Sequence, residues 1–174
     1  MHLYRWYILK YGSYALAAMV LFHLQTASGL LDIGGGYPMP VIALAVTVAV
    51  CERELPGALF SCFCGFLCDL FGYAPMGYYM LLLTLLGVVI ALVAHNLLQP
   101  SWWVCLLGSY ITTLLCRLIL LLFRFAIHGI PGSARVLLRF DLPLALYTAV
   151  FSVPLFYWVQ HLHRLAQERS ATRL

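Results

Sequence analysis

Charged residues are scarce in this chain of 174 residues, because Asp, Glu, Lys and Arg together make up only 9% of it. A soluble domain carries roughly a quarter of its residues as these four types. A small domain also leaves a large share of its residues in contact with solvent. A chain that is 64% hydrophobic could not hide its apolar side chains under those conditions. The shortage of charge therefore excludes an ordinary water-soluble globular domain.

Motifs that carry chemistry are also missing from the chain. The run Gly34-Gly35-Gly36 lacks the preceding strand and following helix that a dinucleotide fingerprint requires, and no phosphate-binding loop occurs. The serines have no histidine expected at the same depth to act as a base, and Asp69 is the one plainly intramembrane carboxylate. We therefore expect no enzymatic activity and no cofactor.

Six cysteines are present, but none belongs to a CxxC pair. All lie in or beside apolar stretches, where free thiols act as small hydrophobic side chains. Cys64 and Cys68 are one helical turn apart, yet a structural zinc ion needs four ligands and a polar second shell. We predict no metal site. The net charge of +4 comes from cations at helix and chain ends, which does not indicate a nucleic-acid partner.

What the chain does have is a series of long apolar stretches separated by Gly, Pro and charged turns. A helix needs about 20 apolar residues to cross the hydrocarbon core of a membrane. The stretches predict helices at residues 8–28, 38–51, 55–71, 77–97, 102–126 and 142–160, of which the second is short. The predicted fold class is all-α, a polytopic membrane protein built as one compact bundle of about six transmembrane helices over residues 1–174.

Lysine and arginine indicate the orientation of such a bundle, since cytoplasmic loops carry an excess of them. If both ends of the chain are inside, six of these cations fall on the inner side and three on the outer side. The inner set is Arg5, Lys10, Arg53, Arg164, Arg169 and Arg173, and the outer set is Arg124, Arg135 and Arg139. This predicts a multi-pass protein of the plasma membrane with both termini in the cytoplasm.

The segment 55–71 carries a stripe of small residues. Gly57, Ser61, Gly65 and Asp69 recur at every fourth position and so share one helix face. Small residues at this spacing let another helix approach closely, which matters because lipid provides no hydrophobic drive between helices. We expect a seam of internal packing, with contact to another subunit, including a second copy, as the alternative.

The segment 102–126 has a matching stripe that includes Gly108 and Thr112, with Arg117 beside it. At 1.5 Å per residue, Asp69 and Arg117 both fall roughly 21–23 Å from the inner side of the membrane. A lone charge at such depth costs at least ~2.5 kcal/mol, so we hypothesise an intramembrane ion pair between Asp69 and Arg117. The alternative is that Asp69 caps the turn after its helix while Arg117 extends toward the headgroups.

An ordered set of residues in the central part of the chain resembles a known family. The set is Pro38 and Pro40, Gly57, Gly65-Phe66-Leu67-Cys68-Asp69-Leu70, Gly72, and Pro75-Met76-Gly77 leading to Leu81. From about Pro38 to Leu83 the chain is similar to the rod shape-determining protein MreD family. It departs from that family at Met39-Pro40, where an acidic residue is common, and at Met76, where leucine is usual.

The resemblance implies a non-enzymatic scaffold of the bacterial cell-elongation complex, which directs peptidoglycan synthesis and rod shape. Such a scaffold binds MreC and, directly or through it, MreB, RodA and a transpeptidase. Its site residues would be Gly57, Ser61 and Gly65 as a close helix seam, with Asp69, Gly72, Pro75 and Gly77 at its outer end.

Two other functions stay open. Substrate-binding subunits of energy-coupling-factor vitamin transporters are six-helix bundles of this size, and they need a cavity with convergent polar groups. His23, Asp69 and Arg117 could supply some of those groups. A small ion or proton transporter built around Asp69 is the other alternative, although no correspondence between the two halves of the chain is visible.

Overall fold

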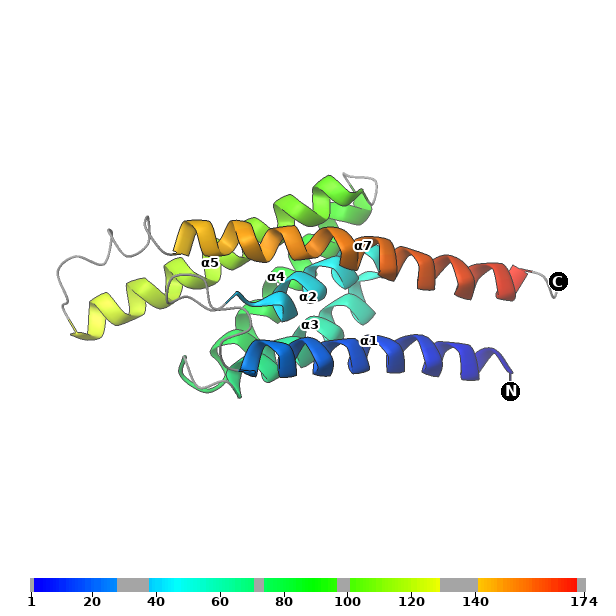
Figure 1. Cartoon of the computed structure of the whole chain (residues 1–174), viewed down its shortest axis with the longest axis horizontal. Helices are drawn as coiled ribbons and strands as arrows, with labels where there is room; N and C mark the ends of the chain where they lie inside the picture. The colour runs from blue at the N-terminus through cyan, green and yellow to red at the C-terminus, as the bar shows by residue number, and fades with distance from the viewer. Residues whose placement is uncertain (1, 28–37, 71–73, 97–100, 129–140, 172–174) are drawn as a thin grey trace.

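The computed structural model describes residues 2–27, 38–70, 74–96, 101–128 and 141–171, with side chains for 9–27, 38–70, 74–96, 101–123 and 141–164. These ranges contain six helices and no strand, which confirms the all-helical fold class (Figure 1). The helices are α1 (His2–Thr26), α2 (Pro40–Cys51), α3 (Glu54–Asp69), α4 (Tyr78–Asn96), α5 (Trp102–His128) and α7 (Leu142–Ala171).

Proline and glycine set several of the helix boundaries. Pro40 occupies the first turn of α2, where its missing N–H group has no intrahelical partner to lose. Glu52 ends that helix in an extended conformation, and its N–H donates to the Val48 carbonyl at 2.8 Å. Gly77 has a φ of +91°, a conformation that glycine adopts without strain, and it turns the chain into α4. Short connections of this kind place consecutive helices side by side.

Helix α2 lies at the centre of the bundle. Every residue from Pro40 to Val50 is buried, and α2 contacts each of the other five helices. Figure 1 shows it between α7 on one side and α1 on the other. Its 12 residues extend only about 18 Å, whereas the hydrocarbon core of a bilayer is about 30 Å thick. The core is therefore organised around one short, uncharged helix, in which Thr47 is the polar exception.

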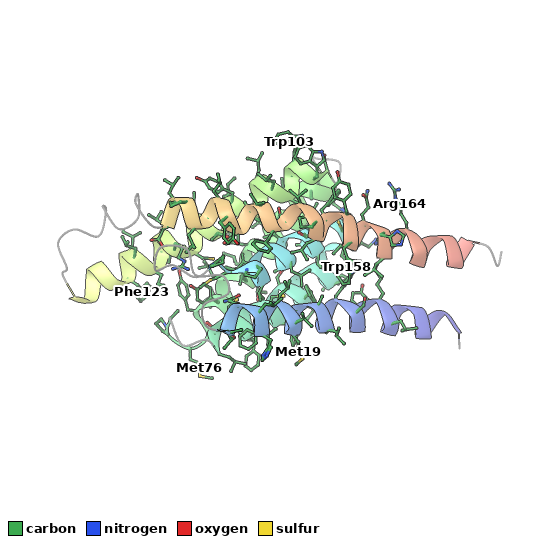
Figure 2. All side chains as sticks on the ribbon, viewed as in Figure 1. Met19, Met76, Trp103, Phe123, Trp158 and Arg164 are labelled. Carbon is green, nitrogen blue, oxygen red and sulfur yellow. The ribbon has the colours of Figure 1, made fainter. Side chains whose placement is uncertain are left out.

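Three helices are long and apolar enough to cross a membrane. They are α4 over Tyr78–Asn96, α5 over Trp102–Phe123 and α7 over Leu142–Arg164. Large apolar side chains also cover the outside of the bundle, as Met19, Met76, Trp103 and Phe123 show in Figure 2. Exposed Met76 and Trp103 belong to different elements, so the apolar surface is not confined to one face. These features indicate a membrane protein.

Helices α3 and α4 form the most extensive helix pair, and α5 packs on α7 on another side of α2. The first part of α1 and the last part of α7 extend past the other helices at the same end of the bundle (Figure 1). Helix α7 continues to Ala171, eleven residues beyond the predicted limit of 160, as a largely polar extension. The long outer helices thus enclose the short α2, whereas α3 keeps exposed side chains such as Leu55 and Leu59.

Candidate functional site

The small-residue stripe of α3 lies inside the bundle. A Cβ atom added to Gly57 would lie 3.1 Å from the Cα of Ala49 in α2. A Cβ added to Gly65 would lie 2.5 Å from the Cα of Met80 and 2.6 Å from the Tyr79 carbonyl oxygen in α4. Both glycines therefore permit backbone-to-backbone contact on two sides of α3. The stripe serves internal packing, not an exposed contact surface.

Ser61 continues this seam by packing against Gly87 of α4, a residue that was not predicted from the sequence. A Cβ added to Gly87 in α4 would collide with the hydroxyl and Cβ of Ser61. Gly87 is buried, as are Leu83 and Ala91 one turn before and after it. That spacing of small and buried residues in α4 mirrors the stripe of α3, and it is the sequence signal that could have revealed the partner helix.

Asp69 joins the end of α3 to the start of α4. Its Oδ1 accepts a hydrogen bond from the backbone N–H of Tyr79, and its Oδ2 accepts one from the N–H of Met80, both at 2.9 Å. These N–H groups belong to the first turn of α4, where no intrahelical acceptor exists. The negative charge also complements the positive end of the helix dipole. Asp69 thus caps α4 from the preceding helix.

Arg117 forms an ion pair with Asp141 instead of the hypothesised partner Asp69. Its Nη1 lies 3.6 Å from Oδ1 of Asp141, the residue directly before α7, and both side chains are largely buried. Among the described residues, no ion pair joins Asp69 to Arg117. The reason is physical: two N–H groups of α4 already satisfy the Asp69 carboxylate, and Asp141 supplies the counter-charge to Arg117. The hypothesised pair is therefore replaced by two separate contacts.

The remaining predicted residues fall in the same region of the bundle. Pro75 and Gly77 form the turn before α4, in which their carbonyls accept from the N–H groups of Tyr78 and Leu81 at 3.1 and 3.0 Å. A Cβ added to Gly108 would lie 3.2 Å from Cγ1 of Val46, so α5 approaches α2 closely there. Thr112 is buried on α5. Gly72 lies outside the described residues.

The cap predicts a moderate and specific loss of stability on substitution. Asp69→Ala removes both acceptors and should lower the free energy of unfolding by about 1–2 kcal/mol, the usual range for a lost N-cap. Asp69→Asn keeps one acceptor and should lose less. Unfolding in mixed detergent micelles would measure both changes. The matched control is Arg117→Gln, whose effect should add to that of Asp69→Ala; strong non-additivity would restore the direct ion pair.

A buried ion cluster at the other end of α3 was not foreseen. Lys10 was predicted only as one of the cations that indicate orientation, but Lys10 and Glu52 are just 8% and 5% exposed. They form an ion pair through Lys10 Nζ and Glu52 Oε1. The hydroxyl of Tyr14 donates to the same oxygen at 3.2 Å, and that of Tyr11 to Oε2 at 3.5 Å. With His163 of α7, these residues form what we term the Glu52 cluster.

The Glu52 cluster keeps its carboxylate ionised although it is buried. Burial raises the pKa of Glu52, but hydrogen bonds and charge from His163 and Lys10 lower it by more, so the pKa lies below its usual value. A buried charge is costly unless a partner and hydrogen bonds compensate it. Lys10 also lies over the rings of Tyr11 and Tyr14, at 5.8 and 6.0 Å from their centroids. The cluster therefore ties α1, the α2–α3 turn and α7 together.

His163 occupies a position between the two charges. Its Nδ1 lies 3.0 Å from Lys10 Nζ and 3.4 Å from Glu52 Oε1. A lysine ammonium only donates, so the shorter contact requires Nδ1 to accept, whereas a bond to Glu52 would require it to donate. The same ring nitrogen thus lies within reach of both members of the ion pair. The sequence signal for this cluster was Glu52 itself, which directly follows a helix without charged residues.

The described side chains bring together helix caps and ion pairs, not a reactive set. No group of three or more His, Cys, Asp or Glu side chains within the described ranges is placed to hold a metal ion. The described cysteines of α3 and α5 are free thiols. Comparisons of the chain with protein-family models, with curated proteins and with solved structures find no match. The class that the fold and these contacts define is an all-helical protein with membrane-compatible helices.

Proposed function

We propose that this chain is a non-enzymatic membrane scaffold of the bacterial cell-elongation complex. The resemblance to the MreD family over about Pro38 to Leu83 is the basis of this proposal. The observation that carries it is the placement of Gly57, Gly65 and Asp69, because all three lie at contacts that lock α3 to its neighbours. The residues that define the resemblance are thus the ones on which this part of the fold depends.

In this proposal all six helices are embedded in the plasma membrane and both termini are cytoplasmic. The projecting ends of α1 and α7 would then lie together on the cytoplasmic side (Figure 1). The exposed polar residues Arg53 and Glu54 would lie on that side too, between the short helices. The opposite end of the bundle would present the Pro75–Gly77 turn and the Arg117–Asp141 pair to the outer leaflet.

A scaffold acts by holding partners in a fixed arrangement, so its requirement is rigidity and not turnover. The α2–α3–α4 unit meets this requirement through close backbone contacts at Gly57 and Gly65. The lipid-facing surfaces of α4 and α5 carry rows of exposed apolar residues on which membrane helices of partners could pack. The partners proposed are an MreC-like protein and, directly or through it, MreB, RodA and a transpeptidase, together with membrane lipids and a possible second copy.

Partner capture tests this function directly. The tagged chain, crosslinked in its native cells and purified, should recover an MreC-like protein and the elongation synthases by mass spectrometry. An unrelated six-helix membrane protein with the same tag and expression level is the control. Recovery of paired ATPases with a transmembrane coupling subunit would overturn the scaffold and favour a vitamin-transporter substrate subunit. Recovery of neither set above the control would also count against the proposal.

A further inference from the structure

The Glu52 cluster contains one group that changes its charge near neutral pH. Histidine is the side chain that ordinarily gains a proton between pH 8 and pH 5. The side chain of His163 is 30% exposed, whereas those of Lys10 and Glu52 are 7% and 6% exposed. His163 is therefore the member of this triad that exchanges protons with the surrounding water.

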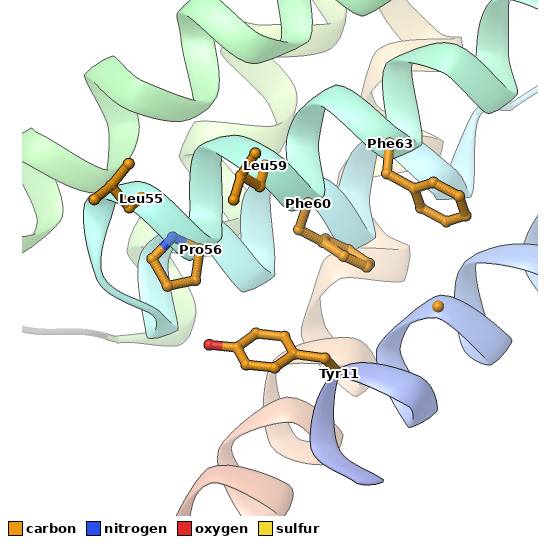
Figure 3. A pocket seen from close by; sticks show the side chains of 7 residues that line it. Tyr11, Leu55, Pro56, Leu59, Phe60 and Phe63 are labelled. Atoms are coloured by element: carbon orange, nitrogen blue, oxygen red, sulfur yellow. The ribbon is translucent and has the colours of Figure 1, made fainter. Parts of the chain in front are cut away.

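Aromatic rings border the cluster on the side of α1 and α3. The ring of Tyr14 meets those of Phe60 and Trp158 edge-on, with 5.9 and 6.1 Å between the ring centroids. Figure 3 shows Tyr11 across an apolar hollow from Phe60, with its hydroxyl pointing toward the start of α3. Charges interact more strongly in such surroundings than in water. A change of charge on the histidine ring therefore acts strongly on the ion pair.

The Nδ1 atom of His163 can serve only one member of the ion pair at a time. It lies 3.0 Å from Nζ of Lys10 and 3.4 Å from Oε1 of Glu52. In a neutral ring with its proton on Nε2, Nδ1 accepts a hydrogen bond from the ammonium. In the imidazolium both ring nitrogens carry protons, so Nδ1 donates to the carboxylate and repels the ammonium. The two distances are similar, so attraction and repulsion nearly cancel and the hydrogen bond from Lys10 is lost.

The Glu52 carboxylate is already shared when the ring takes up a proton. Its Oε1 atom pairs with Lys10 and accepts from the Tyr14 hydroxyl at 3.2 Å, and a protonated Nδ1 is a third donor to that same oxygen. Helix α1, which carries Lys10, packs less extensively on its neighbours than α7, which carries His163. Competition for Oε1 therefore displaces Lys10 and α1, while α7 stays in place.

We propose that His163 is a proton-operated switch: its neutral ring fastens α1 through Lys10, and its protonated ring takes over Glu52 and loosens α1. Fastening is complete near pH 8 and is lost as the pH falls through the range in which histidine titrates. Although burial raises the pKa of Glu52, contacts with His163 and Lys10 hold it below the usual value, so Glu52 stays ionised throughout that range.

The groups around the triad leave this pH range to the histidine. Phenols and thiols ordinarily titrate above it. The titratable neighbours are Tyr11 and Tyr14 on α1 and Cys51 on α2, and exposed Arg164 follows the ring on α7. Figure 2 shows Arg164 where α7 begins to extend past the other helices. Loosening of α1 would thus rearrange the two projecting helix ends. This inference concerns the isolated chain and does not depend on the scaffold function.

Nitrogen-15 NMR of labelled histidine tests the protonation step on the purified full-length protein in lipid nanodiscs. The His163 signals are assigned with the variant His163→Gln. At pH 8 Nδ1 should be unprotonated and Nε2 protonated, and at pH 5 both nitrogens should carry protons. A neutral ring with its proton on Nδ1 at pH 8 would mean that the ring is bonded to Glu52 throughout, and the switch would then be wrong.

Amide hydrogen exchange of residues 9–18 tests the loosening of α1. After correction for the intrinsic pH dependence of exchange, their protection relative to α4 should fall about tenfold between pH 8 and pH 5, the effect of losing one hydrogen bond to a charged group. His163→Gln does not titrate and offers both an acceptor and a donor, so its protection should stay constant. The matched control His161→Gln removes an exposed histidine of the same helix and should keep the wild-type response.

Two results of the exchange experiment would overturn the proposal. One is an equal fall in protection in wild type and His163→Gln, which would assign the pH response to another group. The other is constant protection in wild type while the NMR signals show His163 gaining its proton. His163→Asn carries the same amide group on a shorter side chain and replaces His163→Gln in both measurements if the latter does not fold. Because the purified chain has no partner, neither result bears on the scaffold function.

Discussion

Gly65→Ala should be one of the most damaging single-atom additions in this chain. The new methyl group would lie 2.5 Å from the Cα of Met80 and 2.6 Å from the carbonyl oxygen of Tyr79, so α4 must move as a whole to admit it. Overpacking against fixed atoms costs typically 1–3 kcal/mol, and we expect the upper end of that range, about 3 kcal/mol. The displacement would also pull the N–H groups of Tyr79 and Met80 away from Asp69.

The same substitution at Gly12 is a matched control. Gly12 is an exposed residue of α1, and a Cβ added there meets no atom within 4 Å. Gly12→Ala should therefore gain up to about 1 kcal/mol from helix propensity alone. A thiol-reactive dye reports unfolding in detergent, because Cys64 and Cys68 are buried until the bundle opens. Equal midpoints for Gly65→Ala and wild type would show that the seam is looser than described.

Removal of one charge from the Glu52 cluster should lower the free energy of unfolding at least as much as Gly65→Ala does. Lys10→Met leaves the Glu52 carboxylate buried without its counter-ion, and Glu52→Gln leaves the Lys10 ammonium in the same state. Breaking a buried ion pair from one side typically costs about 3–5 kcal/mol. We expect each variant to lose that much free energy of unfolding in mixed detergent micelles, with α1 detaching first because the cluster is its main polar contact.

A double-mutant cycle measures the interaction energy between Lys10 and Glu52 separately from their contacts with other residues. Lys10→Met combined with Glu52→Gln should cost clearly less than the sum of the two single variants, because no buried charge is then left alone. Glu54→Gln is the control, since Glu54 is exposed at the start of α3 and should contribute no more than about 1 kcal/mol. Additive effects of Lys10 and Glu52 would mean that the two groups act independently.

The helices could be predicted from the sequence because apolar length and turn residues are local properties. The predicted segment 102–126 and the observed α5 (Trp102–His128) begin at the same residue, directly after the sequence Pro100-Ser101. The small-residue stripe of α3 was visible for the same reason, since a period of four residues can be read along one segment. Its partner Gly87 was harder to identify, because the sequence does not say which helices become neighbours.

Charged residues were placed less well, because their partners are distant in sequence. Glu52 contacts Lys10 and His163, which lie 42 residues before it and 111 residues after it. No local sequence pattern predicts a contact between residues so far apart in the chain. Asp69 was assigned to Arg117 on the basis of equal depth, but depth fixes only one of three coordinates. The backbone N–H groups of α4, which no side-chain pattern reveals, are nearer and satisfy both carboxylate oxygens.

The shortness of α2 has a consequence for how the chain is assembled in a cell. A helix about 18 Å long is too short to be retained by a membrane insertion channel as an independent anchor. Its apolar surface is covered only by neighbouring helices, so its burial depends on their arrival. Its start is tied to α7, because the N–H of Met39 donates to the hydroxyl of Thr148, 109 residues further along the chain, at 3.3 Å. The surroundings of the central helix are therefore complete only once α7 has been made and packed against it.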